Sequence, residues 1–308
     1  FYSERDVVLD ERRRRMESNP YGPFYEELDA VFYTSHPYRR PVLGWQWDVE
    51  RLSRADAEAF FRANYTPDHA TLALVGDVKA EDAFALAERY FGRLKPSEAP
   101  QARITREPAQ SGERRVTMKI QAMQTVVIAY HAPEFTGEDS PALEVAAAVL
   151  NGRSGRLYKD LILTKDIALS AGAWSSSLRH AGEFGFSAQV KEGHTHREVE
   201  DALLAHVDGL TKEPPTEHEM GRVANAIEAS FVDGLRTNGG IAGELAHYQT
   251  LGDWRLLLTR MERLKEVTPA DVARVAEEYL TEKNRTVGWI VREPADAGTQ
   301  PAQGGGAQ

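Results

Sequence analysis

The second half of the chain carries a regular succession of strand-like and helix-like patterns. Residues 116–120 alternate apolar and polar positions and 125–131 are rich in valine, and both patterns are typical of strands. Further strands are expected at 168–177, 182–190 and 285–291. Helical spacing predicts helices over 141–151, 157–163, 197–210, 217–234, 241–251, 254–265 and 269–279. Residues 114–294 therefore have the pattern of a complete α+β unit.

The first half has the pattern of only part of such a unit. Helices are expected over 4–16, 26–33, 54–64 and 80–91, with Ser53 as an N-cap, and a short strand is expected at 71–77. The last of these helices should bury its apolar side, formed by Phe84, Leu86, Ala87, Tyr90 and Phe91. Residues 1–98 thus form a first unit, 99–113 a proline-containing polar linker, and 295–308 a disordered tail.

The two units end in the same way. Residues 60–72 and 275–287 both read as helix, aromatic residue, short polar turn and strand. This parallel favours an internal duplication. In that interpretation the first copy lacks its opening strands, whereas the second copy has them.

Composition narrows the class of protein. A chain of 308 residues has room for two domains. The net charge of −10 argues against nucleic acid or an anionic membrane as the main partner. The absence of cysteine excludes disulfides and thiolate metal ligands. No apolar run has the length of a membrane span, and the compartment stays open, with the bacterial periplasm preferred to the cytoplasm.

A pair of carboxylates near the start of the chain is the main chemical clue. Glu4 and Glu11 are seven residues apart, so on a helix they lie two turns apart on almost the same face. The spacing alone is common on a solvated acidic helix face, and Arg15 would support Glu11 there as an i,i+4 partner. Since the chain begins at Phe1 inside this helix, we expect it to start in the middle of a domain.

Several short motifs, in their order and spacing, resemble the pitrilysin/insulinase family of zinc peptidases, including its bacterial and mitochondrial processing-peptidase branch. The family segment Glu-Arg-x-x-(apolar)-x-x-Glu stands here at 4–11. The stretches at 36–44, 65–67 and 74–77 are also typical of the family. Residues 151–157 are similar to its glycine-rich loop before a helix.

The resemblance implies a fold and a metal. The fold is α+β, with two homologous α/β-roll units of mostly antiparallel sheet, helices packed on one face, and a first unit truncated at its N-terminus. The cofactor is Zn²⁺, with Glu11 as the third ligand and Glu4 as a supporting carboxylate that orients a histidine. The family's H-x-x-E-H motif lies upstream of this point, and the sequence contains no such motif. This stretch alone should therefore be inactive.

The resemblance also implies a partner. Complete members carry an Arg and a Tyr after the glycine-rich loop, and Ile162 and Leu169 stand at those positions here. Neither side chain can donate a hydrogen bond to an oxyanion. We therefore expect a heterodimer in which a homologous sister subunit supplies these donors and the substrate is an unfolded peptide that adds to a sheet edge. The alternative is a non-catalytic scaffold or assembly subunit of the same fold.

Other polar groups are weaker candidates. His194 with His196, and the segment 217–219 around His218, could hold a metal, but we expect surface histidines there. His36 before Pro37 is interpreted as a packing or loop residue. The loop 152–155 lacks the ending of a P-loop and is interpreted as a helix-entry turn. The basic run 12–15 is expected to be a solvated helix side, or a contact to the sister subunit or substrate.

Overall fold

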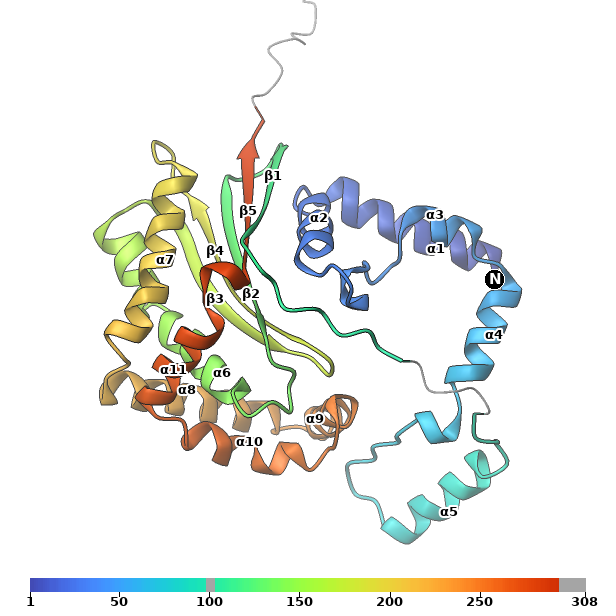
Figure 1. The fold of residues 1–308 in the computed structure, drawn as a ribbon. Coiled ribbons are helices and arrows are strands. Elements are labelled where there is room, and N and C mark those ends of the chain that lie inside the picture. The colour runs from blue at the N-terminus through green and yellow to red at the C-terminus, as the bar shows by residue number, and fades with distance from the viewer. Residues whose placement is uncertain (98–102, 294–308) are drawn as a thin grey trace, which may run out of the picture.

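A computed structural model describes residues 1–97 and 103–293 (Figure 1). Its centre is a five-stranded sheet with the order β1-β5-β2-β4-β3. The outer pair β1 and β5 is parallel, and the other neighbours are antiparallel. The strands are β1 (Arg114–Ile120), β2 (Thr125–Ala132), β3 (Ala168–Ser177), β4 (Gly182–Val190) and β5 (Arg285–Arg292). All five were predicted from the sequence, and the α+β fold class is confirmed.

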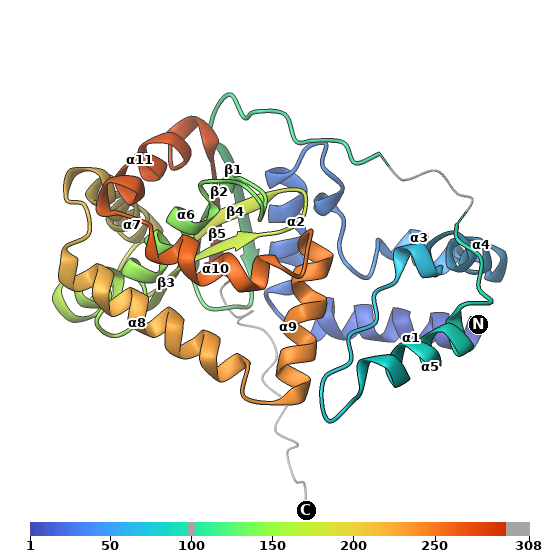
Figure 2. The same ribbon diagram turned by 90° about the horizontal axis from the view of Figure 1, so that it is seen from below.

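Helices cover one face of this sheet (Figure 2). Val126, Ile128 and Tyr130 of β2 point into a core shared with these helices and are fully buried. Because alternate residues of a strand face opposite sides, β2 contributes every second residue to this core. The helices of this unit are α6 (Ser140–Leu150), α7 (His196–Lys212), α8 (Glu217–Gly234), α9 (Asn238–Leu251), α10 (Leu256–Lys265) and α11 (Pro269–Tyr279), with a π-helical segment at Tyr158–Thr164.

One helix from the first half of the chain packs on the opposite face of the same sheet. α2 (Gly22–Phe32) places Phe24 and Leu28 against Val127 and Ile290. The ring of Phe24 lies over Gly288, where an added Cβ would come within 2.6 Å of it. Arg114 of β1 donates to the carbonyls of Val31 and Phe32 at 3.0 and 2.5 Å and closes the end of the helix. The sheet of the second half therefore carries a helix of the first.

The remaining elements of the first half lie further from the sheet. α1 (Tyr2–Arg13) continues into a π-helical turn at Arg14–Ser18, and α3 (Gln46–Arg51) packs beside α1. α4 (Arg54–Asn64) and α5 (Ala80–Phe91) extend away from the sheet (Figure 1). α4 begins at a capping box in which Ser53 and Asp56 bond reciprocally, as the N-cap prediction required. Short 3-10 turns stand at Pro37–Arg39, Pro67–His69 and Glu282–Asn284.

Two predictions for the first half are wrong. Residues 71–77 are extended but form no strand, because no described segment pairs with them. The apolar side of α5 is not buried: Phe84 is 74% exposed, and Leu86, Tyr90 and Phe91 are at least half exposed, since no described element packs on them. The predicted tail at 295–308 lies outside the described residues. Within the described part of the chain, no helix has the length and apolar character needed to cross a membrane.

Candidate metal-binding helix

The carboxylate pair lies on α1, as the spacing predicted. Glu4 is exposed in the first turn, and Glu11 is partly exposed two turns further on. The Oε1 atom of Glu11 accepts from Arg15 Nε at 2.8 Å, and its Oε2 atom lies 3.3 Å from Arg14 Nη2. Exposed ion pairs of this kind contribute only about 0–1 kcal/mol. Glu11 is therefore held in place by bonds that a stronger ligand could displace.

The described residues do not form a zinc site by themselves. No group of three His, Cys, Asp or Glu side chains within residues 1–97 and 103–293 is arranged to hold a metal ion. A catalytic zinc needs three protein ligands with one position left open. Glu11 can supply one oxygen ligand, so two further donors must come from outside this part of the molecule.

The basic run after Glu11 is not solvated along its whole length. Arg13, Arg14 and Arg15 are exposed, but Arg12 is 8% exposed and points inward. Its Nη2 atom donates to both carboxylate oxygens of Glu26 on α2, at 2.9 and 3.0 Å. The prediction of a solvated helix side is therefore wrong for Arg12, because at its helical position the side chain turns toward α2.

A cavity of about 410 Å³ lies beside this ion pair, where α1, α2, α3 and β1 meet. Its walls combine apolar groups with charged ones, and Trp45 and Glu50 line it from the α3 side. The void shows that apolar side chains do not fill the joint behind α1. The wall residues are Leu9, Arg12, Arg13, Met16, Pro23, Glu26, Glu27, Trp45, Gln46, Glu50 and Met118.

The two positions at which the resemblance predicts the family's Arg and Tyr, Ile162 and Leu169, lie near the β3 edge of the sheet. Ile162 is partly buried in the π-helical segment, and Leu169 on β3 is 49% exposed. Further along β3, Ala173 accepts from the side-chain amide of Asn151 and donates its N–H to the Asn151 Oδ1 atom. In the same loop as Asn151, Arg156 pairs with both oxygens of Glu219 at 2.8 and 2.9 Å, so the loop is a structural helix entry, as predicted.

Of the weaker histidine candidates, His196 and His36 have structural roles. His196 is buried and its Nε2 atom bonds to the carbonyl of Ile290 at 2.7 Å, so the prediction of a surface histidine is wrong there. His194 is partly exposed near Glu198, and His218 is exposed. His36 is buried, and its Nδ1 atom accepts from the N–H of Tyr38, which fits the expected loop role.

Two features have no signal in the sequence. Glu107, in the predicted linker, accepts from three consecutive backbone N–H groups of Thr34, Ser35 and His36 and from the Thr34 hydroxyl, at 2.7–2.9 Å.

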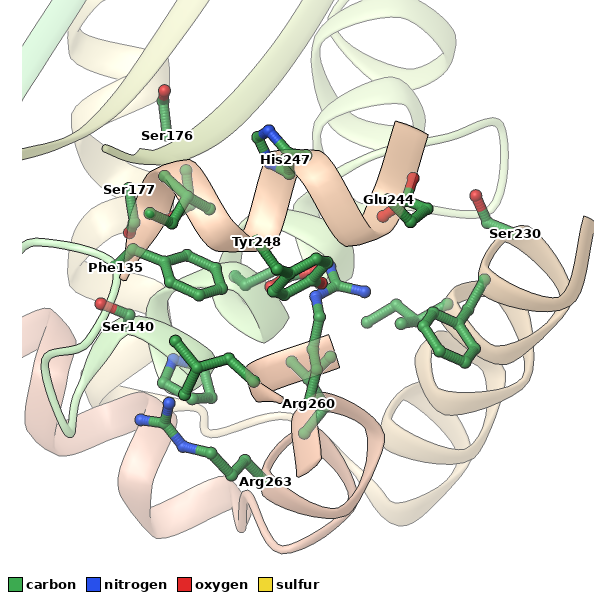
Figure 3. Close-up of a pocket in the computed structure, with 18 of the residues that line it drawn as sticks. Phe135, Ser140, Ser176, Ser177, Ser230, Glu244, His247, Tyr248, Arg260 and Arg263 are labelled. Atoms are coloured by element: carbon green, nitrogen blue, oxygen red, sulfur yellow. The ribbon is translucent and has the colours of Figure 1, made fainter. Parts of the chain in front are cut away.

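The second feature is a cavity of about 530 Å³ in the helical layer, in which Phe135 and Tyr248 meet edge to face beside Arg260 (Figure 3). Both features join segments far apart along the chain, which residue spacing cannot indicate.

Comparisons with known proteins show which family and fold this chain is similar to. A family profile described as "Peptidase M16 inactive domain" matches residues 51–227. The chain is 27% identical over 291 residues to the zinc protease PqqE of Helicobacter pylori, covering 93% of this chain and 66% of that protein. It is 25% identical over 300 residues to a probable mitochondrial-processing peptidase subunit beta of Schizosaccharomyces pombe, covering 92% and 65%. Among solved structures, a protease from Helicobacter pylori matches with a TM-score of 0.87 at 26% identity, over 95% of this chain and 72% of that one.

Proposed function

This chain belongs to the pitrilysin-type (M16) peptidase family, and from that membership we propose that it supplies the carboxylate ligand of a zinc metalloendopeptidase assembled from two homologous subunits. Glu11 is the proposed ligand, and Glu4 is the proposed acceptor that orients a histidine ring. The substrate is an unfolded peptide whose backbone adds to a sheet edge. The chain spans about two thirds of its curated relatives, so these statements concern a longer parent protein.

The single observation that carries the proposal is the placement of Glu11. It lies on the same face of α1 as Glu4, it is accessible, and only exposed arginines hold it. A bound zinc ion supplies Lewis-acid polarisation of the scissile carbonyl. In this chain Glu11 contributes one oxygen, while Arg14 and Arg15 pair with its two carboxylate oxygens.

The other residues indicate which unit supplies the metal ligand and which subunit supplies the oxyanion donors. Residues 1–98 form the C-terminal portion of the metal-bearing unit, 99–113 the linker and 114–294 the homologous second unit. Ile162 and Leu169 leave the second unit without side-chain donors at the family's oxyanion positions. A homologous sister subunit therefore supplies these donors, and the active form is a heterodimer.

A second candidate function is a non-catalytic scaffold of the same fold. The observation that favours it is the apolar pair Ile162 and Leu169, since a scaffold needs no oxyanion donors. A scaffold has no use for two carboxylates on one accessible face of α1. The two functions therefore predict opposite results when Glu11 is changed.

The test replaces Glu11 by Gln in the complete parent protein together with its sister subunit. Zinc content by elemental analysis and hydrolysis of an unfolded reporter peptide should both fall by at least 10-fold, while the circular dichroism spectrum stays unchanged. Asp10→Asn, an exposed neighbour on the same helix, is the matched control and should leave both unchanged. Equal zinc content and hydrolysis in the Glu11→Gln and unaltered proteins would remove Glu11 from the metal site.

A further inference from the structure

α1 is attached to the rest of the molecule in an unusual way for a surface helix. Such helices normally bury an apolar stripe. In α1 the only buried residue is Arg12, and Val7 and Val8 are 52% and 37% exposed. The other partly buried positions of α1 and its π-helical continuation are residues 5, 9, 11 and 16, of which Leu9 and Met16 are apolar. Its most buried contact is therefore polar, beside partly buried Leu9 and Met16.

The contacts of Arg5 and Arg12 run in defined directions. Arg5 Nη1 donates to the carbonyl of Glu50 in α3 at 2.8 Å, in an exposed bond. Arg12 and Glu26 form an ion pair whose side chains are 10% and 17% exposed. The cavity of about 410 Å³ beside this pair is space that the apolar side chains lining it leave unfilled. The Arg12–Glu26 pair is therefore the best-shielded directional contact between α1 and α2.

Glu26 is itself held firmly with respect to the sheet. On α2 it lies two residues from Phe24 and two from Leu28, on the side of the helix away from the sheet, and those two residues pack on Gly288 and Ile290. Rigid contacts thus run from the sheet through α2 and Glu26 to Arg12, the residue next to Glu11. On a helix, neighbouring residues point about 100° apart, so fixing the direction of Arg12 also fixes that of Glu11.

We propose that Arg12 is a positioning residue: its largely shielded ion pair with Glu26 fixes the rotation of α1 about its axis and so sets the direction in which Glu11 presents its carboxylate. This inference rests on the proposed function of Glu11. Its consequence is that the sheet of the second unit, which carries no metal ligand, controls the geometry of a ligand in the first unit.

Substitutions at a shielded ion pair can distinguish its effect on the direction of a helix from its effect on the stability of the fold. Replacing both partners of such a pair by apolar residues is often neutral or stabilising, whereas removing one partner leaves a buried charge. An apolar pair at 12 and 26 can fill space beside the cavity. It cannot reproduce the two directional bonds that orient the helix.

The experiment uses the complete parent protein with its sister subunit and compares three changes at this joint. Arg12→Met removes one partner, Arg12→Met with Glu26→Leu makes an apolar pair, and Arg12→Glu with Glu26→Arg reverses the pair. Arg13→Met, an exposed arginine of the same helix, is the matched control. Zinc affinity is measured by chelator competition, and kcat and KM are measured with a reporter peptide. Scanning calorimetry gives the Tm, and hydrogen exchange in the absence of metal reports the motion of α1.

Arg12→Met should weaken zinc binding roughly 10–100-fold, lower kcat with little change in KM, and speed amide exchange in α1. The apolar pair should recover the Tm but not the zinc affinity, and the reversed pair should recover part of both. The inference is overturned if the apolar pair restores zinc affinity together with Tm, or if Arg12→Met behaves like Arg13→Met. If Glu11→Gln binds zinc normally, the proposed function fails, and hydrogen exchange still reports whether Arg12 fixes α1.

Discussion

At the scale of single residues, the polar groups that shape this molecule are those that join distant segments. Glu107 shows this best, because one carboxylate gathers three backbone N–H groups and a hydroxyl from residues 34–36. Burial raises its pKa, but these hydrogen bonds outweigh burial and bring the pKa down to about 2. The segment predicted as a linker is therefore anchored at this point.

Changing Glu107 to Ala should lower the free energy of unfolding by about 2 kcal/mol or more, because it leaves partly buried N–H groups without an acceptor. Denaturant unfolding at pH 7 measures the loss. Glu134→Ala, which removes an exposed carboxylate, serves as the control. Because the folded pKa is lowered from 4.5, the stabilising contribution of Glu107 is present above pH 4.5 and is lost as the pH falls toward 2. A stability unchanged in Glu107→Ala would contradict an anchoring role.

His131 should give the protein a second, separate pH dependence. Burial lowers its pKa to about 4, and its ring stacks on Phe32 at a centroid distance of 4.0 Å. The unfolded chain binds this proton below pH 6.5 and the folded chain only below about 4, so stability should rise between pH 4 and 6.5 by up to about 3 kcal/mol. His131→Leu should flatten that part of the pH profile in thermal unfolding. His218→Leu, at an exposed site, should leave it unchanged.

At the scale of elements, local signals placed the helices and strands well. Four helices begin at a capping box, which is formed by two residues only three positions apart, so the local sequence determines where each helix begins. The capping residues are Ser53, Thr195, Thr216 and Thr268. The strand predicted at 71–77 did not form, although residues 60–75 repeat the helix, 3-10 turn and extended order seen at 269–292. A strand is stabilised by its neighbours, and β5 has two whereas 71–77 has none among the described residues. Local pattern could predict the extended backbone but not its pairing.

The contact between α2 and the sheet depends on Gly288 having no side chain. At Gly288 a Cβ would meet the ring of Phe24 at 2.6 Å and Leu28 at 3.2 Å. Gly288→Ala should therefore destabilise the protein by roughly 1–3 kcal/mol through overpacking, as measured by urea unfolding. Gly209→Ala in α7, where a Cβ meets nothing within 4 Å, should be neutral or stabilising. Phe24→Leu should recover part of the loss at Gly288. Equal stability of the two alanine variants would show that α2 does not pack as described.

At the scale of the whole molecule, the two halves differ in how completely they bury their apolar side chains. The second half has one continuous core, whereas α4, α5 and the segment between them expose most of their large apolar residues. The sequence predicted this difference only indirectly, through the expectation that the first unit lacks its opening strands. It also predicted where Glu4 and Glu11 lie, because helical spacing is local. It could not predict the buried Arg12–Glu26 pair, since contacts between helices depend on how the elements pack.

The exposed apolar residues lead to a prediction for a longer parent protein with strands before Phe1. Leu72 and Leu74 are 56% and 52% exposed, and their extended backbone suits pairing with such a strand. In the parent protein, backbone amides at 71–75 should exchange with solvent at least 100-fold more slowly than in the 308-residue chain, because pairing and burial protect them. Amides of Val287 and Ile290, already in the sheet, should be protected in both proteins and provide the internal control. The shorter chain should also bind a hydrophobic dye that the parent excludes. Fast exchange at 71–75 in the parent, with β5 still protected, would mean that another surface pairs with the added strands and that the duplication hypothesis is wrong for the first unit.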